Sequence, residues 1–214
     1  LNGLRALLSA GVDLEQRDYT RATFTALLFA VHHKKSQTCP KYEDMKLLLE
    51  AGADVNARME WSIGSDGGPT CLHRAIMDGN NVMLSLLLEA GADVDMKICL
   101  PAGTPPRDNW LNALHFCCGS KPSSAETVKL LLDAGVDPNS KDPYGYTPLH
   151  EIIIGLRRER VGVDEAVKIV ELLLEAGADP HVLDDFGRTP LVIAGDVLKA
   201  GDQEMIDLLR EAMK

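Results

Sequence analysis

Histidines, cysteines and carboxylates are the side chains through which this chain could hold a metal or carry out catalysis. His150 and Glu151 begin the pattern HExxH, but the second histidine that a zinc protease needs is missing. His32, His33 and Cys39 stand close together, and we interpret them as polar residues of a turn, with metal binding as the weaker alternative. The sequence therefore predicts no metal site and no cofactor.

Motifs for phosphate binding and nucleophilic catalysis are also missing. The glycine-rich run 64–68 lacks the Lys-Ser/Thr that completes a P-loop, and we find no paired carboxylates, serine elbow or kinase motifs. The five cysteines have neither CxxC spacing nor the even number of a disulfide framework, which favours free thiols in a reducing compartment. We therefore expect an intracellular protein, cytoplasmic or nuclear, that is not an enzyme.

Charge and hydropathy exclude two classes of partner. Of the 214 residues, 22 are Lys or Arg and 32 are Asp or Glu, which gives a formal net charge of −10. Nucleic acids and anionic membranes both require clustered positive charge, so we expect neither as a partner. No apolar run approaches the roughly 18 residues of a membrane-spanning helix. The chain opens at Leu1 with no secretory leader, and we expect it to be part of a longer protein.

Two interleaved phrases organise the chain into repeats. The first is Leu-Leu-x-Ala-Gly-x-Asp, in which apolar residues precede the glycine at helical spacing and the glycine can end the helix. The second is Thr147-Pro148-Leu149-His150, where the threonine can cap a helix and the proline suits its first position. Each repeat is therefore predicted to be a helical hairpin. The glycines of the first phrase are Gly11, Gly52, Gly91, Gly135 and Gly177, and variants of the second phrase begin at Thr25, Thr70, Asn112 and Thr189.

With these two phrases the chain resembles the ankyrin repeat family, whose unit of about 33 residues carries both. The resemblance covers nearly the whole chain and implies an all-α fold, a solenoid of stacked helical hairpins with protruding finger loops. The intervals between phrases depart from the family only by long insertions in loops. We expect a single domain over 1–214, with a partial repeat at 1–11 and repeats at about 12–52, 53–91, 92–135, 136–177 and 178–214.

The resemblance also assigns structural roles to residues that could otherwise be taken for chemistry. His73, His115 and His150 fall where the family uses a buried histidine for hydrogen bonds between neighbouring loops. Cys117 and Cys118 fall where the family has two alanines on the buried side of the first helix. We therefore expect all five side chains to be packed inside the protein.

Aromatic residues concentrate in the segments between one hairpin and the next, which the family presents as fingers beside a concave surface. Such residues are frequent anchors of protein interfaces. Tyr144 and Tyr146 flank Gly145 in the finger of the family's usual length, and we expect both to face solvent. Seven of the aromatic residues lie in these segments, namely Tyr19, Phe24, Trp61, Trp110, Tyr144, Tyr146 and Phe186.

The predicted function is a protein-interaction module that binds a partner protein or peptide on the concave surface of fingers and first helices. The acidic composition favours a neutral or basic partner, and we expect a monomeric domain. Two alternatives stay open: a domain that recruits substrate for a larger enzyme, and a scaffold that self-associates through its N-terminal helix. The predicted binding residues are Arg21, Phe24, His32, Met77, Asp78, Asp108, Asn109, Tyr144, Tyr146, Ile154, Phe186 and Arg188.

Overall fold

The computed structural model describes residues 2–17, 25–32, 42–59, 67–99, 110–119, 121, 123–197 and 203–214; of Asn2, His32, Cys99, Trp110 and Val197 it describes the backbone only. These residues form helical hairpins, as the repeated phrases predict. The first helices of the hairpins are α2 (Ala26–His32), α4 (Cys71–Met77), α6 (Ala113–Gly119), α8 (Pro148–Arg157) and α10 (Pro190–Val197). The second helices are α3 (Tyr42–Glu50), α5 (Asn81–Glu89), α7 (Ala125–Asp133), α9 (Val163–Glu175) and α11 (Gln203–Ala212), and α1 (Asn2–Ser9) precedes them all.

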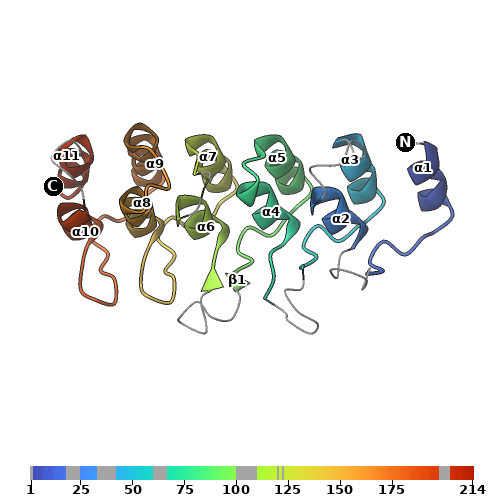
Figure 1. Ribbon diagram of the computed structural model, residues 1–214, viewed down its shortest axis with the longest axis horizontal. Coiled ribbons are helices and arrows are strands. Elements are labelled where there is room, and N and C mark those ends of the chain that lie inside the picture. Colours follow the sequence, from blue (N-terminus) through green and yellow to red (C-terminus); the bar gives the residue numbers. More distant parts are fainter. Residues whose placement is uncertain are drawn as a thin grey trace.

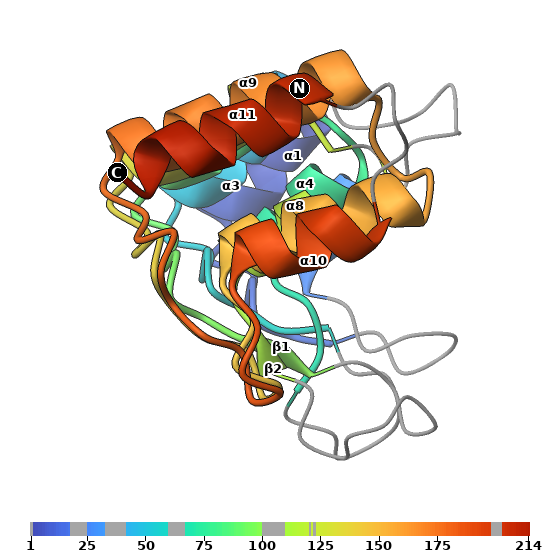
Figure 2. The ribbon, with the colours of Figure 1, turned by 90° about the vertical axis from the view of Figure 1, so that its left-hand side faces the viewer.

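The hairpins stack side by side into a two-layered array. Figure 1 shows the first helices in one row and the second helices in another, with the connecting fingers extending from the row of first helices. Each first helix packs on its neighbour, as α6 does on α8 and α8 on α10, and each hairpin packs its own two helices together. Figure 2 shows the fingers projecting away from both layers. The predicted all-α solenoid with protruding fingers is therefore confirmed.

The residues of the two phrases set the ends of the helices. At the start of α8 the Thr147 N–H donates to Nδ1 of His150, with the two nitrogens 3.1 Å apart. The same pair recurs at the start of α4, from the Thr70 N–H to His73 Nδ1. At the end of α7 the backbone of Gly135 has a φ of 90°, a left-handed conformation that suits glycine. Its N–H donates to the Leu132 carbonyl and so satisfies a helix end.

Apolar side chains between the layers form one continuous core. Leu84, Leu131 and Leu149 come from three successive hairpins and are each fully buried. Cys117 and Cys118 are fully buried as unpaired thiols, which confirms their expected place in the core. Burial raises the pKa of the Cys117 thiol to about 12, so the thiol stays protonated and unreactive at neutral pH.

One finger also contains a short strand pair. The strands β1 (Ile98–Cys99) and β2 (Trp110–Leu111) lie antiparallel between α5 and α6, with Ile98 opposite Leu111. The two strands lie on either side of the predicted long insertion in the sequence. In the part of the chain that the structure describes, no helix combines the length and hydropathy needed to cross a membrane.

Candidate functional site

The best-defined part of the concave surface is built from two neighbouring fingers: the fourth finger (136–146) before α8 and the fifth finger (178–188) before α10. In the fourth finger the Asp142 carboxylate accepts from the N–H groups of Tyr144 and Tyr146, at 2.9 and 2.7 Å. The Asp142 N–H in turn donates to the Tyr146 carbonyl at 2.9 Å. One aspartate thus fixes the backbone on which both tyrosines are presented.

The fifth finger repeats this arrangement and adds a charge pair. The Asp184 carboxylate accepts from the N–H groups of Phe186 and Arg188, at 2.9 and 2.8 Å. It also accepts from the Arg188 guanidinium, with Nη2 and Oδ2 2.8 Å apart. Burial alone would raise the pKa of Asp184, but these hydrogen bonds from Arg188 and Phe186 lower the pKa below its ordinary value. Asp184 therefore carries its negative charge at neutral pH and holds Arg188 in place.

The two fingers are joined to each other along their length. The Asp185 N–H donates to the Tyr144 carbonyl at 3.0 Å. Gly145 has a φ of 75°, and a Cβ added there would lie 2.8 Å from the Asp185 backbone nitrogen, so only glycine fits this approach. Nη2 of Arg188 donates to the Tyr146 hydroxyl at 3.0 Å. The fingers consequently form one rigid surface.

Rings and a guanidinium gather on this surface. The ring centroids of Tyr144 and Tyr146 are 5.9 Å apart, and the Tyr146 ring lies 5.8 Å from that of His150. The Arg188 guanidinium stands 5.1 Å from the centre of the Phe186 ring, within cation–π range. Phe186 is 64% exposed, which is unusual for so large an apolar side chain. We name Tyr144, Tyr146, Phe186 and Arg188 the finger cluster.

Buried histidines link each first helix to the next finger. His150 is fully buried, and its Nε2 lies 3.1 Å from the Arg188 carbonyl. His115 places its Nε2 2.9 Å from the Tyr146 carbonyl in the same way. Burial lowers the pKa of both histidines, so each ring is neutral at pH 7 and carries one N–H. In His150 that N–H is at Nε2 and donates to the carbonyl, because Nδ1 accepts from the Thr147 N–H. In His115 Nδ1 lies 2.7 Å from the acceptor Oδ1 of Asn112, so the single proton serves either Asn112 or the Tyr146 carbonyl. The predicted structural role of these two residues is confirmed.

His73 differs from the other two histidines in one bond. Its ring is fully buried, as expected, and its Nδ1 lies 2.9 Å from the Thr70 hydroxyl at the start of α4. Within the described residues, however, its Nε2 has no hydrogen-bond partner. Burial, with help from the positive charge of Arg58, lowers the pKa of His73 to about 4. The predicted burial of His73 is confirmed, and a backbone interaction with Met96 in the next finger opposes this fall in pKa.

The structure brings only part of the predicted binding set together. Met77 and Ile154 occupy corresponding positions near the ends of α4 and α8 and are both half-buried. Asp78 follows α4 and pairs with Arg74, with Oδ2 and Nε 3.1 Å apart, so its charge is already partnered. The remaining members are not placed: Arg21, Phe24, Asp108 and Asn109 lie outside the described residues, and only the backbone of His32 is described.

The expectation that Tyr144 and Tyr146 face solvent is wrong in part. Both are half-buried, and Tyr146 packs against the hydrophobic core. Burial raises the pKa of Tyr146 despite the opposing effect of Arg188, so its hydroxyl stays protonated. The Tyr146 ring lies beside the rings of Tyr144 and His150, and Arg188 of the fifth finger donates to its hydroxyl. Tyr146 therefore packs against the core and is only partly exposed to solvent.

A half-buried glutamate on α8 was missed by the sequence reasoning. Oε2 of Glu151 lies 2.6 Å from where a Cβ on Gly119 of α6 would stand, so the missing side chain of Gly119 makes room for it. Burial, and then the negative charge of Asp142, raise the pKa of Glu151 to about 7, although Arg158 and Arg160 oppose the rise. Its signal in the sequence is a single acidic residue in a first helix that is otherwise mostly apolar.

This geometry suits recognition by contact. Among the described residues no group of three or more histidine, cysteine or acidic side chains is arranged to hold a metal ion. The described thiols Cys71, Cys117 and Cys118 are buried. The described residues form a stack of hairpins that presents aromatic and charged side chains on its fingers, which is the architecture of a helical repeat protein.

Comparison with protein families gives this class a name. A family description for three copies of the ankyrin repeat matches residues 1–98, and the single ankyrin repeat matches 109–143 and 144–185. The chain belongs to the ankyrin repeat family. Ankyrin repeats are generally protein–protein interaction modules and are typically not enzymes. Comparison with curated proteins gives no match.

Proposed function

We propose that this chain binds a partner protein or peptide of neutral or basic character on its concave surface, with the finger cluster as the anchor. The observation that supports this proposal is that an aromatic ring is exposed to solvent while its backbone is held by a hydrogen bond. Phe186 is 64% exposed, yet its backbone is held by Asp184 at 2.9 Å. A rigid aromatic side chain loses little conformational entropy when a partner covers it, so such residues make strong interface anchors.

Two further features support a basic or neutral partner. The chain carries a net charge of −10, which would repel an acidic protein. Arg188 is engaged by Asp184 and Tyr146, so its charge is largely matched within the fingers. The rings of Tyr144 and Phe186 then offer contact area to apolar residues of the partner, or to its cations.

We also propose that the chain acts as a monomeric module in a reducing intracellular compartment. Three of its cysteines are unpaired and buried, an arrangement that needs no oxidising environment. We further propose that the chain itself carries out no catalysis, since ankyrin repeats typically serve recognition.

The test compares capture of partners by the parent chain and by single variants. The chain is immobilised, exposed to lysate, and the retained proteins are quantified by mass spectrometry. Phe186→Ala and Tyr144→Ala should each reduce retention of the same specific proteins by about tenfold or more, as expected for central anchors. The matched control is Val82→Ala on α5, which removes a side chain that is 62% exposed on another face.

The outcome against the proposal is equally concrete. Equal retention by parent, Phe186→Ala and Tyr144→Ala would exclude the finger cluster as the anchor. Thermal unfolding of each variant accompanies the experiment, so that a lost partner is not confused with a lost fold.

A further inference from the structure

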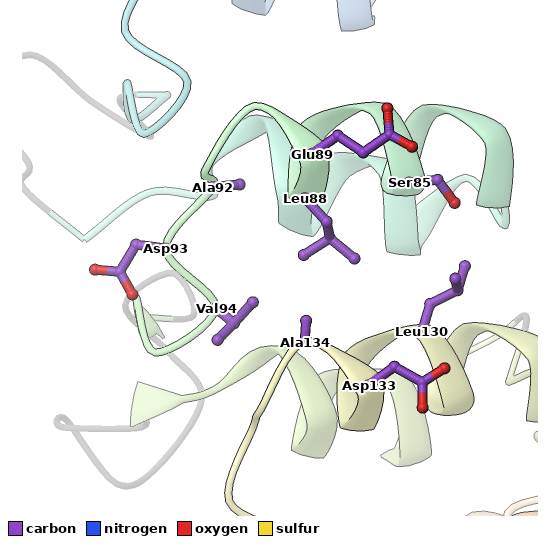
Figure 3. Close-up of a pocket in the computed structure, with 9 residues that line it drawn as sticks. All are labelled: Ser85, Leu88, Glu89, Ala92, Asp93, Val94, Leu130, Asp133 and Ala134. Atoms are coloured by element: carbon purple, nitrogen blue, oxygen red, sulfur yellow. The ribbon is translucent and has the colours of Figure 1, made fainter.

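A groove lies between two second helices, in the layer that contributes none of the proposed concave residues. It has a volume of about 560 Å³ and is bounded by the C-terminal halves of α5 and α7. Figure 3 shows Leu88, Val94 and Ala134 directed toward one another across its middle. The lining residues are Ser85, Leu88, Glu89, Ala92, Asp93, Val94, Leu130, Asp133 and Ala134.

The groove combines an apolar floor with acidic edges. Leu88, Val94 and Leu130 are half-buried and form the floor, whereas Glu89 and Asp133 are exposed on opposite sides, one on each helix. Asp93 stands at the end of the groove and already accepts from the Asp95 N–H at 2.9 Å. No lysine or arginine lines the groove. The charged side chains that line it are therefore all acidic.

The second helices of the two neighbouring hairpins each carry a lysine that α5 lacks. On α3, Lys46 pairs with Glu50 one turn later, with Nζ and Oε1 3.9 Å apart. On α7, Lys129 pairs with Asp133 in the same way at 3.4 Å. Each lysine stands six residues before the glycine that ends its helix, and on α5 that position is Ser85. Glu89 consequently lacks the cation that Glu50 and Asp133 have on their own helices.

We propose that this groove binds a basic segment of a partner protein, with an arginine or lysine of the partner taking the place of the missing helix lysine. The alkyl part of such a side chain would lie on Leu88 and Leu130, because long basic side chains readily cover apolar surface. Its charged end would meet Glu89, whose own helix supplies no lysine, and charge-assisted hydrogen bonds there favour a guanidinium. This second surface is separate from the finger cluster and needs no part of it.

The probe is a short labelled peptide that carries two Leu-Arg pairs, with binding followed by fluorescence anisotropy. A matched peptide has citrulline, a neutral isostere, in place of both arginines. We expect the arginine peptide to bind at least about tenfold more tightly than the citrulline peptide. Equal binding of the two peptides would overturn the proposal, because the groove would then not recognise a cation.

Variants of the chain locate the site. Ser85→Lys restores the pattern of Lys46 and Lys129, so it should fold normally and weaken peptide binding at least about tenfold by filling the groove. Ser85→Ala leaves the groove open and should bind as the parent does. Ala212→Lys adds the same charge at an exposed position of α11 and should change binding less than about twofold.

The remaining outcomes decide between a specific site and general attraction to an acidic protein. Equal weakening by Ser85→Lys and Ala212→Lys, or no weakening by Ser85→Lys, would overturn the proposal. A gain-of-function variant completes the test: Lys46→Ser removes the corresponding lysine from α3 and should open a second peptide site between α3 and α5. A stoichiometry that stays at one peptide would contradict the role assigned to the lysine.

Discussion

The guanidinium of Arg188 donates to the hydroxyl of Tyr146, 42 positions earlier in the chain, with Nη2 and Oη 3.0 Å apart. This bond crosses from the fifth finger to the fourth, and Arg188 also contacts Asp184 and the Phe186 ring. The residues proposed to meet a partner are thus held by one another before any partner arrives. Such preorganisation lowers the entropy lost on binding.

The first prediction concerns this bond. Tyr146→Phe removes the hydroxyl but keeps the ring, and we expect it to lower the free energy of unfolding by about 1 kcal/mol. In a double-mutant cycle with Arg188→Ala, the two changes should be less than additive, with a coupling of about 0.5–1 kcal/mol. Chemical denaturation of the four proteins measures this. Strict additivity would mean that the bond contributes nothing to stability.

The second prediction separates the two roles of His150. His150→Ala should lower the free energy of unfolding by about 1–3 kcal/mol, because the Thr147 N–H and the Arg188 carbonyl both lose a buried partner. His150→Asn can still accept from the Thr147 N–H but cannot reach the next finger, so we expect an intermediate loss. Adding a chelator should change neither result. A stability that falls with chelator in the parent and not in His150→Ala would assign the histidine to a metal instead.

The third prediction uses two glycines with nearly the same backbone conformation. Gly145 has a φ of 75° and Gly187 one of 74°. A Cβ on Gly145 would lie 2.6 Å from Oδ1 of Asp185 and 2.8 Å from its backbone nitrogen, whereas in the described structure one on Gly187 meets nothing within 4 Å. Gly187→Ala should therefore cost about 1 kcal/mol of strain, and Gly145→Ala clearly more. Thermal unfolding compares them, and equal losses would argue against the close contact of the two fingers.

The fourth prediction follows from Glu151, whose pKa is raised from 4.5 to about 7. Between these values the folded chain holds a proton that the unfolded chain has released, so this group's contribution to stability falls as pH rises and stays low above pH 7. Glu151→Gln removes the charge, so it should stabilise the protein by about 2 kcal/mol at pH 8 and by little near pH 4.5.

Urea denaturation of parent and Glu151→Gln across this pH range tests the sign. Taking the difference between the two proteins cancels the titration of other groups, including the buried histidines. A stabilisation that does not grow with pH would show that Glu151 is well solvated in the folded chain.

The fold was predictable from the sequence because its signals are local. The glycine at 135 and the threonine at 147 act on the backbone beside them, so the helix ends depend on a few neighbouring residues. The helix ends could therefore be predicted from the residues themselves. The burial of the histidines and cysteines was implied by the resemblance to the ankyrin repeat family.

The parts that could not be predicted depend on residues far apart in the chain. The bond of Tyr146 to Arg188 joins positions 42 apart, and the place of Glu151 depends on the missing side chain of Gly119. The groove between α5 and α7 could be predicted in part. Aligning the repeats by their glycines places Ser85 opposite Lys46 and Lys129, and this difference in charge is visible in the printed sequence.

The histidine bonds between neighbouring units also bear on how the chain folds. They join residues 31 and 38 positions apart, so each bond closes a loop about one repeat long. This loop length does not depend on the number of hairpins in the array. Short loops close quickly, and an array of this kind can nucleate at one place and grow by adding neighbours. His115 and His150 make two such bonds in succession, so we expect the nucleus to contain α6 to α9. Pulsed hydrogen exchange would then show amides of α8 protected before those of α2, with the array growing toward its N-terminus one hairpin at a time.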